Sequence, residues 1–233
     1  MLHLLLAAFG TSLLAGMRHA TDPDHVVAVT TIVSRERSVW RAAMVGAMWG
    51  LGHTLTILVV GALLVGFELT LSPRVGLSME FAVAAMLVTL GVLNLAGTRL
   101  PHTHPRAAAA GVAASDEDGP LPGRRTLPPF VVGTVHGLAG SAAATLFVTS
   151  LIPDPRWAMA VLLVFGVATI LGMMLVTMLI ALPSAFAAAR LGHLQRGLRI
   201  ASGVGSIAFG LWLAHQIGVR DGLFTATPTW SAH

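Results

Sequence analysis

One short stretch of an otherwise apolar sequence holds most of the side chains that could bind a metal ion. It carries His19, Asp22, Asp24 and His25 within eight residues. His19 and Asp22 are three residues apart, as are Asp22 and His25, and residues at this spacing share one face of a helix. Imidazole and carboxylate together are typical ligands of nickel, cobalt, zinc or iron, whereas magnesium prefers oxygen alone. The stretch therefore predicts a site for a divalent transition-metal ion.

Pro23 lies in the middle of this stretch. His19 and His25 are six residues apart and would lie on different faces of an unbroken helix. Proline removes a backbone donor and can kink or unwind a helix, so a break at Pro23 would let both imidazoles turn toward one point. The alternative is a loop at the membrane surface, where polar side chains cost little. The apolar run 26–33 follows at once and argues against that alternative.

The chain that carries this motif has the composition of a membrane protein. Of its 233 residues, 55% are hydrophobic and 10% are charged, whereas a soluble domain has about 25% charged residues. A helix needs about 20 apolar residues to cross a bilayer. We therefore predict an all-α polytopic membrane protein of about six transmembrane helices. The segments are Leu2–Val33 with a polar break, Ala43–Phe67, Met79–Gly97, Pro129–Ile152, Trp157–Leu182 and Leu198–Ile217.

The segment between the third and fourth predicted helices differs in composition from its flanks. Residues 99–128 hold five prolines, an alanine run and three consecutive acidic residues, which predicts a flexible loop. The chain then divides into a three-helix half at 1–98 that holds the metal motif, this loop, a second half at 129–218 and a tail at 219–233. His102 and His104 in the loop either collect metal weakly or belong to a plain solvated linker.

The arginines predict how the helices are oriented. All fourteen basic residues are arginines; ten follow the first, third and fifth predicted helices, and three lie on the alternate side. Arginine-rich loops favour the cytoplasm. We therefore expect a bacterial cytoplasmic (inner) membrane protein with both termini outside and loops 34–42, 98–128 and 183–197 in the cytoplasm. The excess of basic over acidic residues is explained by this orientation, and no nucleic-acid partner is expected.

The two halves of the chain resemble each other. Gly16–His19 is similar to Gly133–His136, and in each case a tryptophan follows the histidine after 21 residues. Leu90–Leu93 is likewise similar to Phe209–Trp212. Each half has three spans, an odd number, so the two halves would have opposite orientations in the membrane. Such inverted repeats are common in transporters, where the substrate site lies at the interface between the repeats. We predict two inverted three-helix repeats; chance similarity among apolar helices is the alternative.

Four further polar residues lie inside predicted helices. His53 stands among small residues that allow close helix packing, and it either extends the metal path or bonds to a backbone carbonyl. His136 is the counterpart of His19 and either lines the path or packs between helices. Asn94 and Ser141 are further candidates to line the path, and for Asn94 an interhelical hydrogen bond is favoured.

Two motifs resemble those of the nickel/cobalt transporter (NiCoT) family. Arg18–His25 reads RHATDPDH and is similar to the family's His-Ala-x-Asp-Ala-Asp-His signature, with Pro23 in place of alanine. Gly50–Thr56 reads GLGHTLT and is similar to its Gly-His-Ser/Thr motif. The family's later Asp-Thr motifs are not found. The second half, with His136–Ser141, is more similar to the shorter urease-accessory-type relatives of the same superfamily.

The resemblance implies metal binding and transport by the first motif, with a contribution from the second. The residues concerned are His19, Asp22, Asp24, His25 and His53. We therefore expect a transporter of Ni²⁺ or Co²⁺ as substrate, without a prosthetic group. Because no Gly-x-x-x-x-Gly-Lys loop is present, transport would be secondary. The other expected partners are the lipid bilayer and either a second copy or an accessory subunit.

Three alternatives remain open. The chain either exports metal, or it is an accessory membrane protein that serves urease or hydrogenase maturation. An intramembrane metalloenzyme is disfavoured because the sequence has no His-Glu-x-x-His motif. The chain is therefore not expected to be an enzyme.

Overall fold

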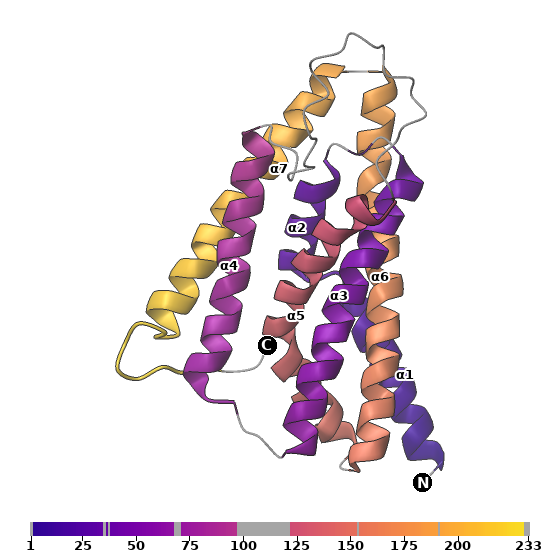
Figure 1. Ribbon diagram of the computed structural model, residues 1–233, viewed down its shortest axis with the longest axis vertical. Helices are drawn as coiled ribbons and strands as arrows, with labels where there is room; N and C mark the ends of the chain where they lie inside the picture. The colour runs from indigo at the N-terminus through magenta and orange to yellow at the C-terminus, as the bar shows by residue number, and fades with distance from the viewer. Residues whose placement is uncertain are drawn as a thin grey trace.

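The computed structural model describes residues 2–34, 36, 38–67, 71–96, 122–152, 154–190 and 192–230. These residues form α-helices joined by short connections, together with one π-helical turn, η1 (Figure 1). The helices are α1 (Leu2–His19), α2 (Pro23–Val33), α3 (Val39–Gly66), α4 (Pro73–Leu95), α5 (Pro122–Leu151), α6 (Pro155–Arg190), α7 (Gly192–His215) and η1 (Gln216–Arg220).

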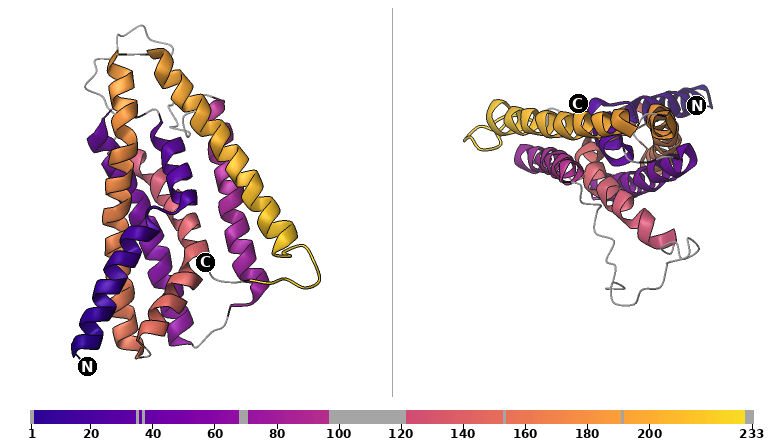
Figure 2. Two further views of the ribbon diagram at one scale, coloured as in Figure 1. Left: turned by 180° about the vertical axis from the view of Figure 1, so that it is seen from behind. Right: turned by 90° about the horizontal axis from the view of Figure 1, so that it is seen from above.

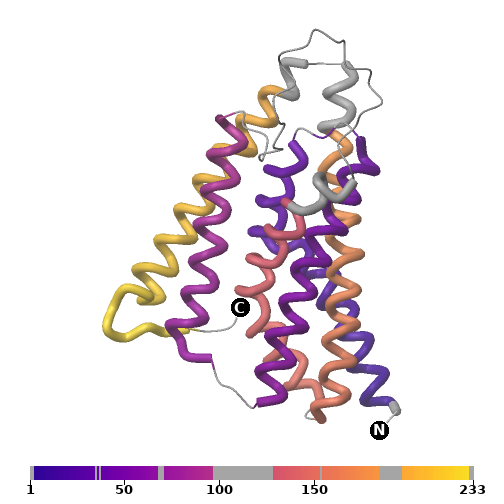
Figure 3. The backbone as a smooth tube through the Cα atoms, viewed as in Figure 1, coloured from indigo at the N-terminus to yellow at the C-terminus, as the bar shows by residue number. Residues whose placement is uncertain are grey.

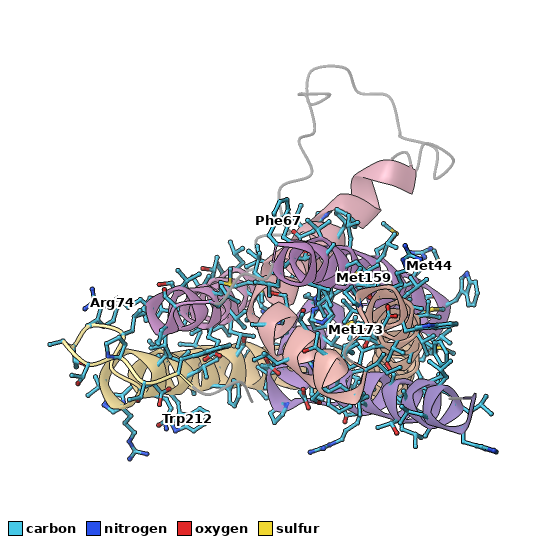
Figure 4. The ribbon with its side chains drawn as sticks, turned by 90° about the horizontal axis from the view of Figure 1, so that it is seen from below. Met44, Phe67, Arg74, Met159, Met173 and Trp212 are labelled. Carbon is cyan, nitrogen blue, oxygen red and sulfur yellow. The ribbon has the colours of Figure 1, made fainter. Side chains whose placement is uncertain are left out.

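Among the described residues, five helical segments are long and apolar enough to cross a bilayer. They are Val39–Gly66, Pro73–Leu95, Pro128–Leu151, Pro155–Pro183 and Arg196–Arg220. Large apolar side chains such as Leu171 and Trp212 face outward, as expected of helices in lipid. Figure 4 shows Trp212 and Arg74 at the periphery of the bundle, whereas Met173 lies inside it. The chain is a polytopic, all-helical membrane protein, as predicted.

The first predicted span is broken in the middle. α1 ends at His19, and α2 begins at Pro23, whose fixed φ suits the first turn of a helix. α1 runs from one end of the bundle to near its middle, and α2 continues from there toward the other end (Figures 2 and 3). Residues 2–33 therefore make one broken traverse rather than two complete spans.

Helices extend beyond the apolar segments that predicted them. α4 begins at Pro73 rather than at Met79, and Ser72 caps it by accepting a hydrogen bond from the backbone N–H of Val75. Capping serines and a proline in the first turn stabilise a helix start whether or not the residues that follow are apolar. Hydropathy detects only the part of a helix that lies in the bilayer, so the predicted starts were too late.

Two predicted loops are partly helical. α5 begins at Pro122, so residues 122–128 are helical and the prediction of a loop over 99–128 was wrong there. α6 continues to Arg190, which shortens the predicted loop 183–197. His102 and His104 lie outside the described residues.

Glycines allow α3 and α5 to pack with their backbones close together. A Cβ added at Gly133 of α5 would collide with the carbonyl oxygen of Trp49 in α3, and one at Gly52 would collide with the carbonyl oxygen of Phe130. At Gly137 the added atom would lie 2.5 Å from the carbonyl oxygen of His53. Small residues are the usual means of close helix approach in membranes. This packing brings the polar positions of α3 and α5 next to each other.

α4 and α7 lie side by side at one edge of the bundle (Figures 1 and 2). A Cβ at Gly91 would lie 2.6 Å from the carbonyl oxygen of Gly203, and one at Gly210 would lie 2.9 Å from the carbonyl oxygen of Ala84. When the two halves of the sequence are aligned with an offset of 119 residues, Gly91 matches Gly210 and Ala84 matches Gly203. The two contacts are therefore reciprocal, and the two halves cross the bundle in opposite directions (Figure 1).

Exchanging Gly133 for alanine should destabilise the protein, because the new methyl group meets a backbone carbonyl that cannot rotate away. Overpacking of this kind costs about 1–3 kcal/mol. The matched control is Gly205→Ala in α7, where an added Cβ meets nothing within 4 Å. Size-exclusion profiles of detergent-purified protein after graded heating should show a lower midpoint for Gly133→Ala alone. Equal midpoints would contradict the close packing of α3 on α5.

Candidate metal site

Four imidazoles from four helices meet beside the break in the first span. The ring centroid of His25 lies 4.7 Å from that of His19, 5.1 Å from that of His53 and 4.2 Å from that of His136. His25, His53 and His136 are almost fully buried, with exposed fractions of 1%, 0% and 2%. The structure thus brings His19, His25 and His53 together, and it adds His136 from the second half. Metal binding by these residues stays a prediction.

His19, His25 and His53 present ring nitrogens to one another. One nitrogen from each lies within 4.8 Å of the others, and the Nε2 atoms of His19 and His53 are 3.0 Å apart. Two nitrogen ligands at about 2.1 Å from one ion, at right angles, stand about 3.0 Å apart. This spacing suits neighbouring ligands of one metal ion as well as it suits a hydrogen bond.

Pro23 determines how the ring of His25 is held. In a continuous helix the carbonyl of His19 would bond to the N–H of residue 23, and proline has none. That carbonyl instead accepts hydrogen bonds from the backbone N–H of Asp22 at 3.1 Å and from Nδ1 of His25 at 2.8 Å. A carbonyl only accepts, so Nδ1 carries the hydrogen and Nε2 of the neutral ring keeps its lone pair.

This lone pair has no partner within the described residues. Nε2 of His25 is buried and makes no hydrogen bond there, and the same holds for Nδ1 of His53 and of His136. A buried polar atom without a partner costs about 1–3 kcal/mol. Histidines that bind metals characteristically donate their other ring nitrogen to a carbonyl or carboxylate. The arrangement around His25 has that form.

Asp22 holds His19 rather than joining the ring nitrogens. It occupies the N-cap position of α2, yet its side chain makes no capping bond. Its Oδ2 lies 2.8 Å from Nδ1 of His19, so that nitrogen donates and Nε2 of His19 is left free to face His53. The carboxylate therefore orients an imidazole in this structure, and its role as a direct metal ligand stays a prediction.

Asp24 connects the first half of the chain to the second. Its Oδ1 accepts a hydrogen bond from the backbone N–H of His25 at 2.9 Å, and its Oδ2 accepts one from Nε2 of His136 at 2.9 Å. It lies in the first turn of α2, where the helix dipole favours a negative charge. One ligand atom from each of Asp24, His25 and His136 lies within 4.8 Å of the others. These residues form a second group of side chains that could hold a metal ion, beside the first.

Asn94 and Ser141 make hydrogen bonds to residues outside the group of imidazoles. Asn94 donates to the carbonyl of Arg199 and to the hydroxyl of Ser202, each at 3.1 Å, which ties α4 to α7. The Ser141 hydroxyl donates to the carbonyl of Leu138 at 2.7 Å. The bonds of Asn94 are of the interhelical kind that the sequence favoured for it.

Two aromatic residues of the site were missed by the sequence analysis. The Trp49 ring lies 5.5 Å from those of both His25 and His136, and Phe165 lies 5.5 Å from His19. Trp49 precedes His53 by four residues on one helix, so its spacing could have placed it on the same face. Phe165 stands in an apolar helix among apolar residues, and no signal in the sequence distinguishes it.

Comparison with known proteins shows one relative of matching length. The chain is 32% identical over 223 residues to the urease accessory protein UreH of Bacillus sp. (strain TB-90), covering 94% of this chain and 96% of that protein. It is 28% identical over 179 residues to the chloroplast protein FOR GROWTH AND FERTILITY 1 of Arabidopsis thaliana, of which it covers 48%. No family model matches the chain. No solved structure matches it either.

The predicted nickel binding should weaken but persist when Asp22 is replaced by asparagine, because its carboxylate holds Nδ1 of His19 and lies outside both groups of ligand atoms. Loss of such an orienting group typically costs about 10–100-fold in affinity. Calorimetric titration of purified protein with Ni²⁺ should place Asp22→Asn between the wild type and His25→Ala. An affinity equal to either of them would refute the orienting role.

Proposed function

Because the chain belongs to the family of the urease accessory protein UreH, we propose that it supplies nickel to an enzyme of the urease type. The observation that carries this proposal is the group of ring nitrogens of His19, His25 and His53, buried at the break in the first span. An accessory protein for a nickel enzyme needs a site that releases nickel again. Histidine nitrogens without thiolates fit that need.

The donor atoms favour a transition-metal ion as the cargo. Imidazole matches nickel, cobalt, copper and zinc, whereas calcium and magnesium prefer an all-oxygen site. The chain has no cysteine, so thiolate ligands are excluded. The relationship to UreH favours nickel among these ions. Cobalt remains the closest competitor because its ligand preferences are similar.

The position of the site supports passage of the ion across the bilayer. The break between α1 and α2 lies near the middle of the bundle (Figure 2), and broken helices at mid-membrane form the substrate sites of many secondary transporters. The reciprocal contacts of Gly91 and Gly210 support descent from an inverted repeat. In such proteins one half rocks against the other, and the site opens to each side in turn.

Import is the direction that an accessory role favours. α3 and α7 begin, and α6 ends, at the same end of the bundle (Figure 1), so the helix ends that flank the arginine-rich segments of the sequence lie together there. Arg41 and Arg196 at this end are exposed. With this end in the bacterial cytoplasm, nickel would be delivered to the compartment where urease is assembled. Efflux is the competing direction.

The relationship to UreH supports this accessory role more directly than the stand-alone nickel/cobalt permease that the sequence motif led us to expect. The two roles share the same physical step, the binding and release of nickel within the membrane. They differ in whether the pure protein is sufficient to move the ion. A partner subunit would be required only for the accessory role.

Expression of the chain should raise urease activity in a host that produces urease in nickel-poor medium. His53→Gln removes a ring nitrogen from the site and should lower that activity at least about tenfold, as loss of metal-binding groups does. His215→Gln, at an exposed position near the end of α7, is the matched control. Excess nickel should restore the activity of the His53 variant.

Equal urease activity for His53→Gln and His215→Gln would refute the assignment of the site. Cellular nickel content measured in the same cultures separates import, which raises it, from efflux, which lowers it. Uptake of radioactive nickel by liposomes that contain only the purified protein then separates a carrier from an accessory protein that needs a partner.

A further inference from the structure

His25 belongs to both groups of metal-binding side chains. One group consists of His19, His25 and His53, and the other of Asp24, His25 and His136. The first group comes from α1, α2 and α3 of the first half, whereas the second reaches into α5 of the second half. The rings of His25 and His136 are stacked, with an interplanar angle of 28°. The two groups are therefore adjacent and joined by one imidazole.

His25 has only one nitrogen to offer to both groups. Its Nδ1 is committed to the carbonyl of His19, which leaves the lone pair of Nε2. One lone pair binds one ion at a time, so the two groups cannot both hold an ion through His25. An ion in either group excludes a second ion from the other.

A single site made of all four imidazoles fits the geometry less well. Among the described residues, His53 and His136 fall into different groups, and neither group of ligand atoms within 4.8 Å of one another holds both. His136 is also engaged by Asp24, whereas His53 faces His19.

We propose that Asp24, His25 and His136 form a second metal position, and that nickel passes between the two positions while bound to Nε2 of His25. This inference rests on the proposed function. During the passage the ion exchanges the nitrogens of His19 and His53 for the carboxylate of Asp24 and a nitrogen of His136. His25 keeps hold of the ion throughout, so the ion never returns to water between the two halves.

The two positions differ in chemistry and therefore in the affinity expected. The first is all nitrogen, which suits nickel. In the second, the ion must compete with the hydrogen bond that already joins Asp24 to His136. The first position should therefore bind more tightly at equilibrium, and the second should matter chiefly for transfer toward the second half.

The test compares His136→Ala in two backgrounds by calorimetric titration with Ni²⁺. In the otherwise wild-type protein the ion stays at the first position, so affinity should fall less than about threefold. In the His53→Ala background only the second position is left to bind the ion. Adding His136→Ala there should reduce the Ni²⁺ affinity by a factor at least about tenfold larger than in the wild-type background. A double-mutant cycle measures this coupling between the two residues directly. A coupling below that size would overturn the second position.

The second arm measures nickel flux into liposomes. His136→Ala should lower the flux at least about tenfold relative to His215→Ala, the exposed control in α7, even though nickel still binds. Flux equal to that of the control would overturn the relay while leaving the proposed function standing. A wild type that neither binds nor carries nickel would instead refute the proposed function itself.

Folding is checked by the heating assay in detergent. Asp24→Asn replaces His136→Ala if that variant fails to fold, because it removes a ligand of the same group and keeps the side-chain volume. The expectations for Ni²⁺ affinity and for flux that were given for His136→Ala then apply to Asp24→Asn. A flux through Asp24→Asn equal to that of the control would overturn the relay.

Discussion

The hydrogen bond from Nδ1 of His25 to the carbonyl of His19 is the interaction on which the site depends. It exists because Pro23 has no N–H to offer that carbonyl, so the helix must break and the carbonyl needs another donor. The bond fixes the tautomer of His25 and turns the lone pair of Nε2 toward the other imidazoles. A residue that interrupts a helix thereby also orients the side chain two positions later.

The surrounding bundle keeps this polar cluster inside an apolar environment. An ionisable side chain at bilayer depth costs about 2.5–3.5 kcal/mol or more, so such residues turn toward protein or a water-filled cavity. The contacts of α3 and α5 at Gly52 and Gly133 bring His53 and His136 within reach of the break. Asp24 is compensated by His136 and by the start of α2. A carboxylate of the first half is thus paired with an imidazole of the second half.

The helical spans could be predicted from hydropathy, because bilayer thickness limits the length of a span. The break in the first span could be predicted from Pro23, because proline limits where a helix can continue. The helical class and the break at Pro23 were therefore predictable. The hydrogen bond between Asp22 and Nδ1 of His19 was not, since spacing alone cannot tell whether a carboxylate faces an ion or a neighbouring histidine. The closeness of His136 to His25 depends on how α5 packs, and only the weak likeness between the halves indicated it. No feature of the sequence indicated that Phe165 contacts His19.

X-ray absorption at the nickel edge of the loaded, purified protein would show whether the buried imidazoles bind a transition-metal ion. We expect at least two histidine ligands with nitrogens at about 2.1 Å, seen as the multiple-scattering signal of imidazole rings. A shell of oxygen atoms alone, as in hydrated nickel, would contradict it.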